Sequence, residues 1–113
     1  MFVPGTRSRS TPSRSSPSRA MPVGILQVRL RLPGTRTLKE KRSVVAAVLA
    51  RARREFNVSA AELDGLDDPK SAVLGFANLS NARGHTDEVL MSLLDALDGN
   101  RDYYVEGHDL SIL

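Results

Sequence analysis

The sequence predicts an α+β domain whose elements follow the order β-α-β-β-α-β. Four segments have apolar residues at every second position or on both sides, which is typical of strands, and two have apolar residues at helical spacing. Breakers such as Pro33-Gly34 and Gly99-Asn100 lie between these segments. The chain of 113 residues is long enough for one such domain.

The first strand is predicted over residues 23–32, where apolar and polar side chains alternate. One face carries Leu26, Val28, Leu30 and Leu32, and the other carries Gln27, Arg29 and Arg31. This period of two predicts a strand that is buried on one face only. The Pro33-Gly34 pair that follows suits the two central positions of a type II turn.

The first helix is predicted over residues 38–55. Thr37 and Glu40 have the spacing of a capping box, with Thr37 as the N-cap. The apolar stripe consists of Leu38, Val44, Val45, Val48, Leu49, Ala52 and Phe56. Charged and small residues cover the rest of the surface, so this helix should be amphipathic.

Two strands are predicted in the middle of the chain. Residues 57–63 favour a short strand, and a polar loop follows over residues 64–69. Residues 71–79 are apolar on both sides, which is typical of a central strand.

The last two elements are a helix that follows Asn81 and a strand over residues 103–112. Asn81 is a suitable N-cap, and Gly99-Asn100 is a typical helix end. The helix stripe consists of Thr86, Val89, Leu90, Leu93, Leu94 and Leu97. Because each helix has one apolar stripe, both should cover the same face of an antiparallel sheet. The expected fold is the ferredoxin-like two-layer sandwich, in which the first and third strands are central.

Residues 1–20 differ in composition from the rest of the chain. They contain three prolines, six serines and four arginines, and no acidic residue. Such a segment cannot bury enough apolar surface to fold, so we predict a disordered basic tail before a single domain over residues 21–113. Three explanations stay open: a start assigned too early, with Met21 as the true start; a basic arm that adds affinity for nucleic acid; or an inert tail.

Composition and charge narrow the functional classes. The whole chain carries +3 and the four tail arginines contribute +4, so the net charge of the domain is about −1 and does not by itself indicate nucleic-acid binding. The chain has no cysteine, and therefore no disulfide or thiolate metal site. It has neither the ~20 consecutive apolar residues of a membrane helix nor the apolar core of a secretory signal. We expect a cytoplasmic protein without membrane association.

One block of the sequence resembles a known family. It reads Leu32-Pro33-Gly34-Thr35-Arg36-Thr37-Leu38-Lys39-Glu40-Lys41-Arg42. Three further segments agree with it: Arg54-Glu55-Phe56-Asn57-Val58-Ser59, Leu74-Gly75-Phe76-Ala77 and Leu79-Ser80-Asn81. From Val23 to Leu113 the chain is similar to the YlxP-like family of small bacterial proteins, whose function is unknown. The tail before Met21 departs from the family pattern.

The resemblance implies a ferredoxin-like fold and no established enzyme activity. Genes of this family often lie beside those of translation-initiation and ribosome-maturation factors, and some members are described as similar to ribosome-binding factors. These associations favour a link to RNA or ribosomes without giving a mechanism.

The candidate RNA-binding residues are basic side chains of the first strand and first helix. They are Arg29, Arg31, Arg36, Lys39, Arg42 and Arg51. Arg36 and Lys39 lie at a helix N-terminus, where free N–H groups and the macrodipole favour a phosphate. The alternative is that these residues are solvating charges, divided between two faces and balanced by the acidic second helix.

The open face of the sheet is the second candidate surface. Ferredoxin-like RNA-binding domains stack bases on aromatic side chains there. This chain has only five aromatic residues, and of the Tyr103-Tyr104 pair one side chain must point outward. An apolar open face also fits a homodimer or a partner protein, and a plain surface of small residues is the third alternative.

No catalytic, cofactor-binding or metal site is predicted. His85 and His108 would have to converge to bind a metal, and no phosphate loop or nucleophile motif is present. The first hypothesis is a non-enzymatic protein that associates with ribosomal RNA or a ribosomal subunit during ribosome maturation or translation. The alternative is a protein-interaction module or homodimer that uses the open sheet face, and a small-molecule enzyme ranks third.

Overall fold

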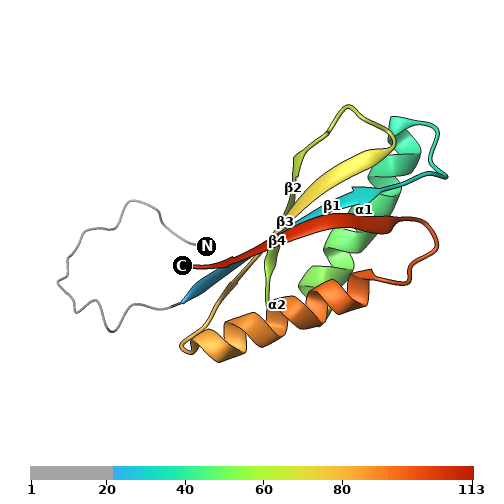
Figure 1. Ribbon diagram of the computed structural model, residues 1–113. Coiled ribbons are helices and arrows are strands. Elements are labelled where there is room, and N and C mark those ends of the chain that lie inside the picture. Colours follow the sequence, from blue (N-terminus) through green and yellow to red (C-terminus); the bar gives the residue numbers. More distant parts are fainter. Residues whose placement is uncertain (1–21) are drawn as a thin grey trace, which may run out of the picture.

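The computed structural model describes residues 22–113, which form a four-stranded sheet and two helices (Figure 1). The elements are β1 (Val23–Arg31), α1 (Leu38–Glu55), β2 (Ser59–Asp64), β3 (Ser71–Leu79), α2 (Arg83–Leu97) and β4 (Tyr104–Ile112). This order confirms the β-α-β-β-α-β prediction. The predicted tail over residues 1–20 lies outside the described residues.

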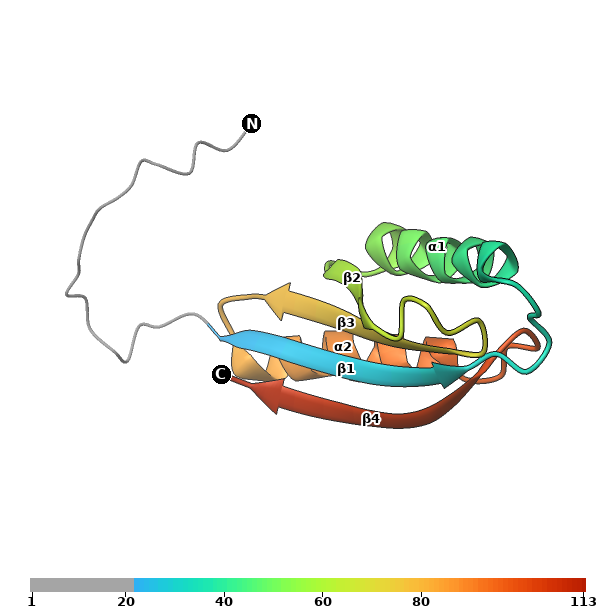
Figure 2. The same ribbon diagram turned by 90° about the horizontal axis from the view of Figure 1, so that it is seen from above.

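The sheet is antiparallel throughout, with the strand order β2-β3-β1-β4 (Figure 2). The central strand β1 sets Leu26 opposite Phe76 of β3 and opposite Leu110 of β4. The first and third strands are therefore central, as the ferredoxin-like prediction requires.

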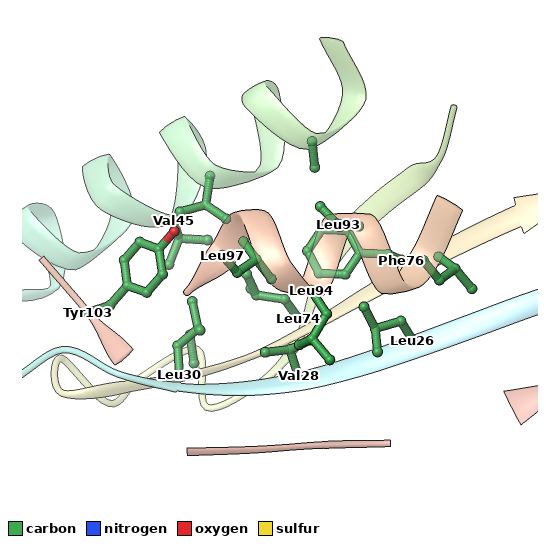
Figure 3. Close-up of a cluster of buried hydrophobic side chains, with 14 of the residues drawn as sticks. Leu26, Val28, Leu30, Val45, Leu74, Phe76, Leu93, Leu94, Leu97 and Tyr103 are labelled. Atoms are coloured by element: carbon green, nitrogen blue, oxygen red, sulfur yellow. The ribbon is translucent and has the colours of Figure 1, made fainter. Parts of the chain in front are cut away.

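The core lies between the helices and one face of the sheet (Figure 3). The even-numbered side chains of β1 and β3 enter it together with the stripes of α1 and α2: Leu26, Val28, Leu30, Ala72, Leu74, Phe76, Val45, Val48, Ala52, Leu90, Leu93, Leu94 and Leu97. Burial of each large apolar side chain contributes about 1.5–3 kcal/mol, so this layer contact is the main stabilising interaction of the fold. The odd-numbered side chains of the same strands consequently face away from the helices.

Two local predictions were wrong, for physical reasons. The N-cap of α2 is Ala82 and not Asn81, and its methyl side chain cannot make a capping bond. The Ser80 hydroxyl accepts the Ala82 N–H at 3.1 Å, which fixes the chain just before the helix. The Pro33-Gly34 turn is not of type II, since Gly34 does not adopt the positive φ that this type requires at its second central position. The turn is closed by the Thr35 N–H, which donates to the Leu32 carbonyl at 3.3 Å.

Candidate nucleic-acid interface

The N-terminus of α1 is capped by the chain itself. The Glu40 carboxylate accepts the backbone N–H groups of Arg36 at 2.6 Å and Thr37 at 3.3 Å, while the Thr37 hydroxyl accepts the Glu40 N–H at 3.1 Å. These bonds, first of all the one from Arg36, hold the pKa of Glu40 below its usual value. A carboxylate thus already occupies the end of the helix that favours anions, which argues against a phosphate site there.

The basic residue Lys41, in the same block, is completely buried. Its Nζ lies 2.8 Å from Glu62 Oε2 in an ion pair that lacks hydrogen-bond alignment, and Nζ donates to the Gly65 carbonyl. The buried Thr35 hydroxyl contacts the carbonyls of Leu32 and Pro69. The block that carries the family resemblance therefore joins β1, α1 and the β2–β3 loop, which indicates a role in stabilising the fold.

Arg29 and Arg31 lie two positions apart on β1, so both side chains are on the open face of the sheet. Both point away from the helices and are exposed. The Arg29 guanidinium lies over Gly107 of β4, where a Cβ atom would come within 2.6 Å of Nη2. Arg31 Nε lies 4.0 Å from Glu106 Oε2, and both side chains are about half exposed, so this ion pair is weak.

Two residues that were not among the predicted site residues join these arginines. Arg31, Lys70, Tyr104 and Pro33 line one surface hollow at the end of the sheet. Lys70 Nζ donates to the Pro33 carbonyl at 3.0 Å, and Tyr104, which is 54% exposed, pairs directly with Arg31 across the strands. We call Arg29, Arg31, Lys70 and Tyr104 the basic corner.

The strand pairing that creates the basic corner contains a local irregularity. The register between β1 and β4 shifts between Arg29 and Leu30, so that Gly107 faces Arg29 while Tyr104 faces Arg31. A bulge of this kind re-aims side chains at the edge of a sheet. The sequence signal for it was Gly107, which interrupts the strand pattern, but the glycine alone does not reveal which residues it brings together.

The remaining predicted residues do not gather at one place. Arg36 lies in the loop before α1; after the two backbone N–H bonds, its charge and that of Lys70 are smaller causes that lower the pKa of Glu40, so both cations lie near that carboxylate. Lys39 and Arg42 are exposed on α1, in the helix layer. Arg51 pairs with Glu55 at 3.1 Å and faces the groove between the helices. The six predicted residues are thus divided between the sheet face and the helix layer.

One acidic group beside the basic corner is already engaged. The Asp68 carboxylate accepts the Lys70 N–H and the Ser71 hydroxyl, each at 2.8 Å. These two bonds lower the pKa of Asp68, with smaller contributions from the charges of Lys41 and Arg31. Asp68 thus remains ionised and fixes the backbone from which Lys70 projects.

The other half of the open face is apolar. Its residues are Ile25, Ala61, Leu63, Gly75, Ala77 and Leu79, which we call the apolar half. Leu63 lies over Gly75, where a Cβ atom would approach its Cδ1 to 2.7 Å. Ile25, Leu63 and Leu79 are 38%, 52% and 54% exposed, respectively. The open face thus combines a charged corner that carries one aromatic ring with an apolar region that carries none.

Residues 22–113 contain neither a metal-binding cluster nor a helix that could span a membrane. No cluster of three or more His, Asp or Glu side chains there has the geometry to hold a metal ion. Neither of the two helices is long and apolar enough to cross a membrane.

Comparison with known proteins places the chain in a family. The model of a family described as a protein of unknown function, DUF503, matches residues 23–109. The uncharacterized protein YlxP of Bacillus subtilis (strain 168) is 36% identical over 62 residues, which are 55% of this chain and 67% of that protein. The matched span includes all six elements of the fold apart from the last residues of β4. The chain therefore belongs to the DUF503 family of proteins of unknown function.

Proposed function

We propose that this protein is a non-enzymatic RNA-binding protein that contacts ribosomal RNA or a ribosomal subunit through the basic corner. The observation that supports the proposal is the single hollow lined by Arg31, Lys70 and Tyr104, with Arg29 beside it on the same face. It lies on the open sheet, the face that ferredoxin-like RNA-binding domains use.

The chemistry of the basic corner suits an RNA backbone with one stacked base. The guanidinium groups of Arg29 and Arg31 can donate paired N–H bonds to phosphate oxygens, and the Lys70 ammonium adds a point charge. The exposed Tyr104 ring offers one stacking surface for a base. With a single aromatic residue, such binding would depend on the phosphates and discriminate little between sequences.

Electrostatic binding of this kind has a measurable signature. Three cations that contact single-stranded RNA give a slope of log K against log salt of about −2. Affinity should therefore fall steeply between low and physiological salt, and the interaction should be weak unless the partner supplies further contacts.

The proposal is tested by co-sedimentation with ribosomal subunits across a salt series. The full chain and a chain that begins at Met21 are compared, because the four tail arginines could bind RNA by themselves. We expect the chain from Met21 to sediment with a subunit at low salt and to dissociate as salt rises. If that chain shows no association at low salt while the full chain does, the tail and not the basic corner is responsible.

A second candidate function, self-association, is favoured by the apolar half. Leucine and isoleucine side chains that gather on an exposed sheet surface are typical of an interface, and a two-fold dimer would bury the same patch on both copies. Acidic Asp109 and Glu106 of β4 share this face with Arg29 and Arg31, so an antiparallel copy could set opposite charges against each other.

Self-association is tested by light scattering at increasing protein concentration. Leu63→Lys should convert a dimer into a monomer, whereas Leu66→Lys should not, because the equally exposed Leu66 lies in the β2–β3 loop. A monomer at every concentration would exclude this second function and leave the RNA proposal untouched.

A further inference from the structure

A small, partly open cavity lies in the groove between the two helices, in the layer opposite the open sheet face. Its volume is about 120 Å³. The walls are apolar side chains of α1 and α2, chiefly Val44, Val48, Ala52, Phe56, Leu93 and Leu97. An apolar cavity of about 150 Å³ in another protein admits benzene, so this one has room for a single medium-sized apolar group.

A buried tyrosine contributes a polar atom to the cavity. Tyr103 is only 4% exposed, and its hydroxyl makes no hydrogen bond with any residue between 22 and 113. Figure 3 shows the ring among the core side chains, with its oxygen directed toward α1 near Val45. Burial raises the pKa of Tyr103, so the hydroxyl keeps its proton and remains a hydrogen-bond donor. The ring is buried, but the hydroxyl is not among the fully buried polar atoms without a partner, so water reaches it and it is free to donate to a ligand in the cavity.

The mouth of the cavity carries two opposite charges. Arg51 projects from α1, and Asp102 projects from the loop before β4. The Nε atom of Arg51 contacts Glu55 at 3.1 Å, which leaves its two terminal nitrogens for another acceptor. The Asp102 backbone N–H donates to the Asn100 side chain at 2.7 Å, which fixes the loop and not the carboxylate. Within the described part of the chain, Arg51 and Asp102 form no ion pair with each other.

We infer that this cavity binds a free α-amino acid with a medium-sized apolar side chain, such as leucine. The side chain fills the apolar cavity, Arg51 and the Tyr103 hydroxyl bind the carboxylate, and Asp102 binds the ammonium group. A simple carboxylic acid would leave Asp102 without a partner, and a simple amine would leave Arg51 and Tyr103 without one. A zwitterion satisfies all three groups at once while its side chain replaces water in the cavity.

This site is separate from the proposed RNA contact. Arg51 lies in the helix layer, whereas Arg29, Arg31 and Lys70 lie on or beside the open sheet face. Failure of one proposal therefore leaves the other standing.

The test is a titration of the full chain followed by tyrosine fluorescence and by calorimetry. The chain has no tryptophan and only two tyrosines, and a Tyr104→Phe background leaves Tyr103 as the sole reporter. We expect a saturable signal with L-leucine up to about 10 mM, ten times a Kd of 1 mM. L-leucinamide lacks the carboxylate charge and N-acetyl-L-leucine lacks the ammonium charge, so each should bind at least about tenfold more weakly, the equivalent of one lost ionic contact. Glycine, which has no side chain, should not bind.

Substitutions of the two charged residues at the mouth of the cavity test whether each of them contacts the ligand. Arg51→Gln and Asp102→Asn should each weaken L-leucine binding about tenfold or more, whereas Arg54→Gln, an exposed arginine on the same helix, should leave it unchanged. Circular dichroism would show that each variant is folded. The inference is overturned if L-leucine, L-isoleucine, L-methionine and L-phenylalanine all give neither a saturable fluorescence change nor heat. It is also overturned if leucinamide binds as tightly as leucine, or if the Arg51 and Asp102 variants bind like the unmodified chain.

Discussion

Two kinds of basic residue lie within a short stretch of the sequence and differ in their surroundings: one is buried and paired, and the others are exposed. Lys41 is fully buried in an ion pair, while Arg29 and Arg31 are exposed on the open sheet face. Lys41 belongs to the motif that carries the family resemblance, whereas Arg29 and Arg31 belong to the proposed RNA contact. A single lysine inside a run of basic residues can thus attach a helix to its sheet through a buried ion pair.

The largest expected effect comes from Lys41→Met. It leaves Glu62, whose side chain is 13% exposed, without its cation, and the loss of one partner of a buried pair costs about 3–5 kcal/mol. Urea unfolding of this variant should show a loss of that size. The exposed Lys39→Met is the matched control and should change the free energy of unfolding by less than about 0.5 kcal/mol. A Lys41→Met/Glu62→Leu double variant should recover most of the loss; equal effects of Lys39→Met and Lys41→Met would contradict the structural role.

An intermediate effect is expected from Thr37→Ala, which removes one half of the capping box. Loss of an N-cap hydroxyl typically costs about 0.5–2 kcal/mol. Thermal unfolding should therefore show a lower midpoint, with RNA binding unchanged. If Thr37→Ala instead abolished RNA binding without a loss of stability, the N-terminus of α1 would be part of the ligand site after all.

The smallest effect concerns acid pH. The pKa of Glu40 is lowered in the folded state, so its stabilising contribution is complete above the ordinary value of 4.5 and is lost as the pH falls through the lower folded value. Stability of the unmodified chain should thus decline below about pH 4.5, and Glu40→Gln should flatten that decline. Urea midpoints measured from neutral pH to pH 3 would decide this; identical pH profiles for both proteins would show that the capping carboxylate contributes nothing.

Much of the secondary structure was predictable from the sequence, because the signals that determine it lie within a few residues of one another. The capping box and the apolar stripe defined α1 from Leu38 to Glu55, and strict alternation defined β1. The start of α2 was not predictable, because asparagine is a favourable N-cap residue and the sequence does not show that the helix begins one residue later, after Ala82. In the structure the Ala82 N–H donates to the Ser80 hydroxyl.

The candidate site was predictable only in part, because its geometry is not local. Arg29 and Arg31 could be placed on one face of a strand by their spacing. Lys70 and Tyr104 reach Arg31 from two other strand ends, through a pairing register that shifts at a bulge. The burial of Lys41 depends on Glu62 and Gly65, both more than 20 residues away, and a lysine inside a charged run gives no local sign of such a partner.

The central claim is that the exposed basic group, and not the helix charges, contacts RNA. It is tested most directly by fluorescence anisotropy of a labelled single-stranded RNA across a salt series, with two matched triple variants of the chain that begins at Met21. Arg29→Ala/Arg31→Ala/Lys70→Ala removes three cations from the basic corner, and Lys39→Ala/Arg42→Ala/Arg54→Ala removes three from α1. We predict that the first variant loses RNA affinity and that the magnitude of its salt slope falls by about 2, while the second behaves like the unmodified protein apart from a small general loss. Equal losses in the two variants, or a loss confined to the α1 variant, would contradict the account.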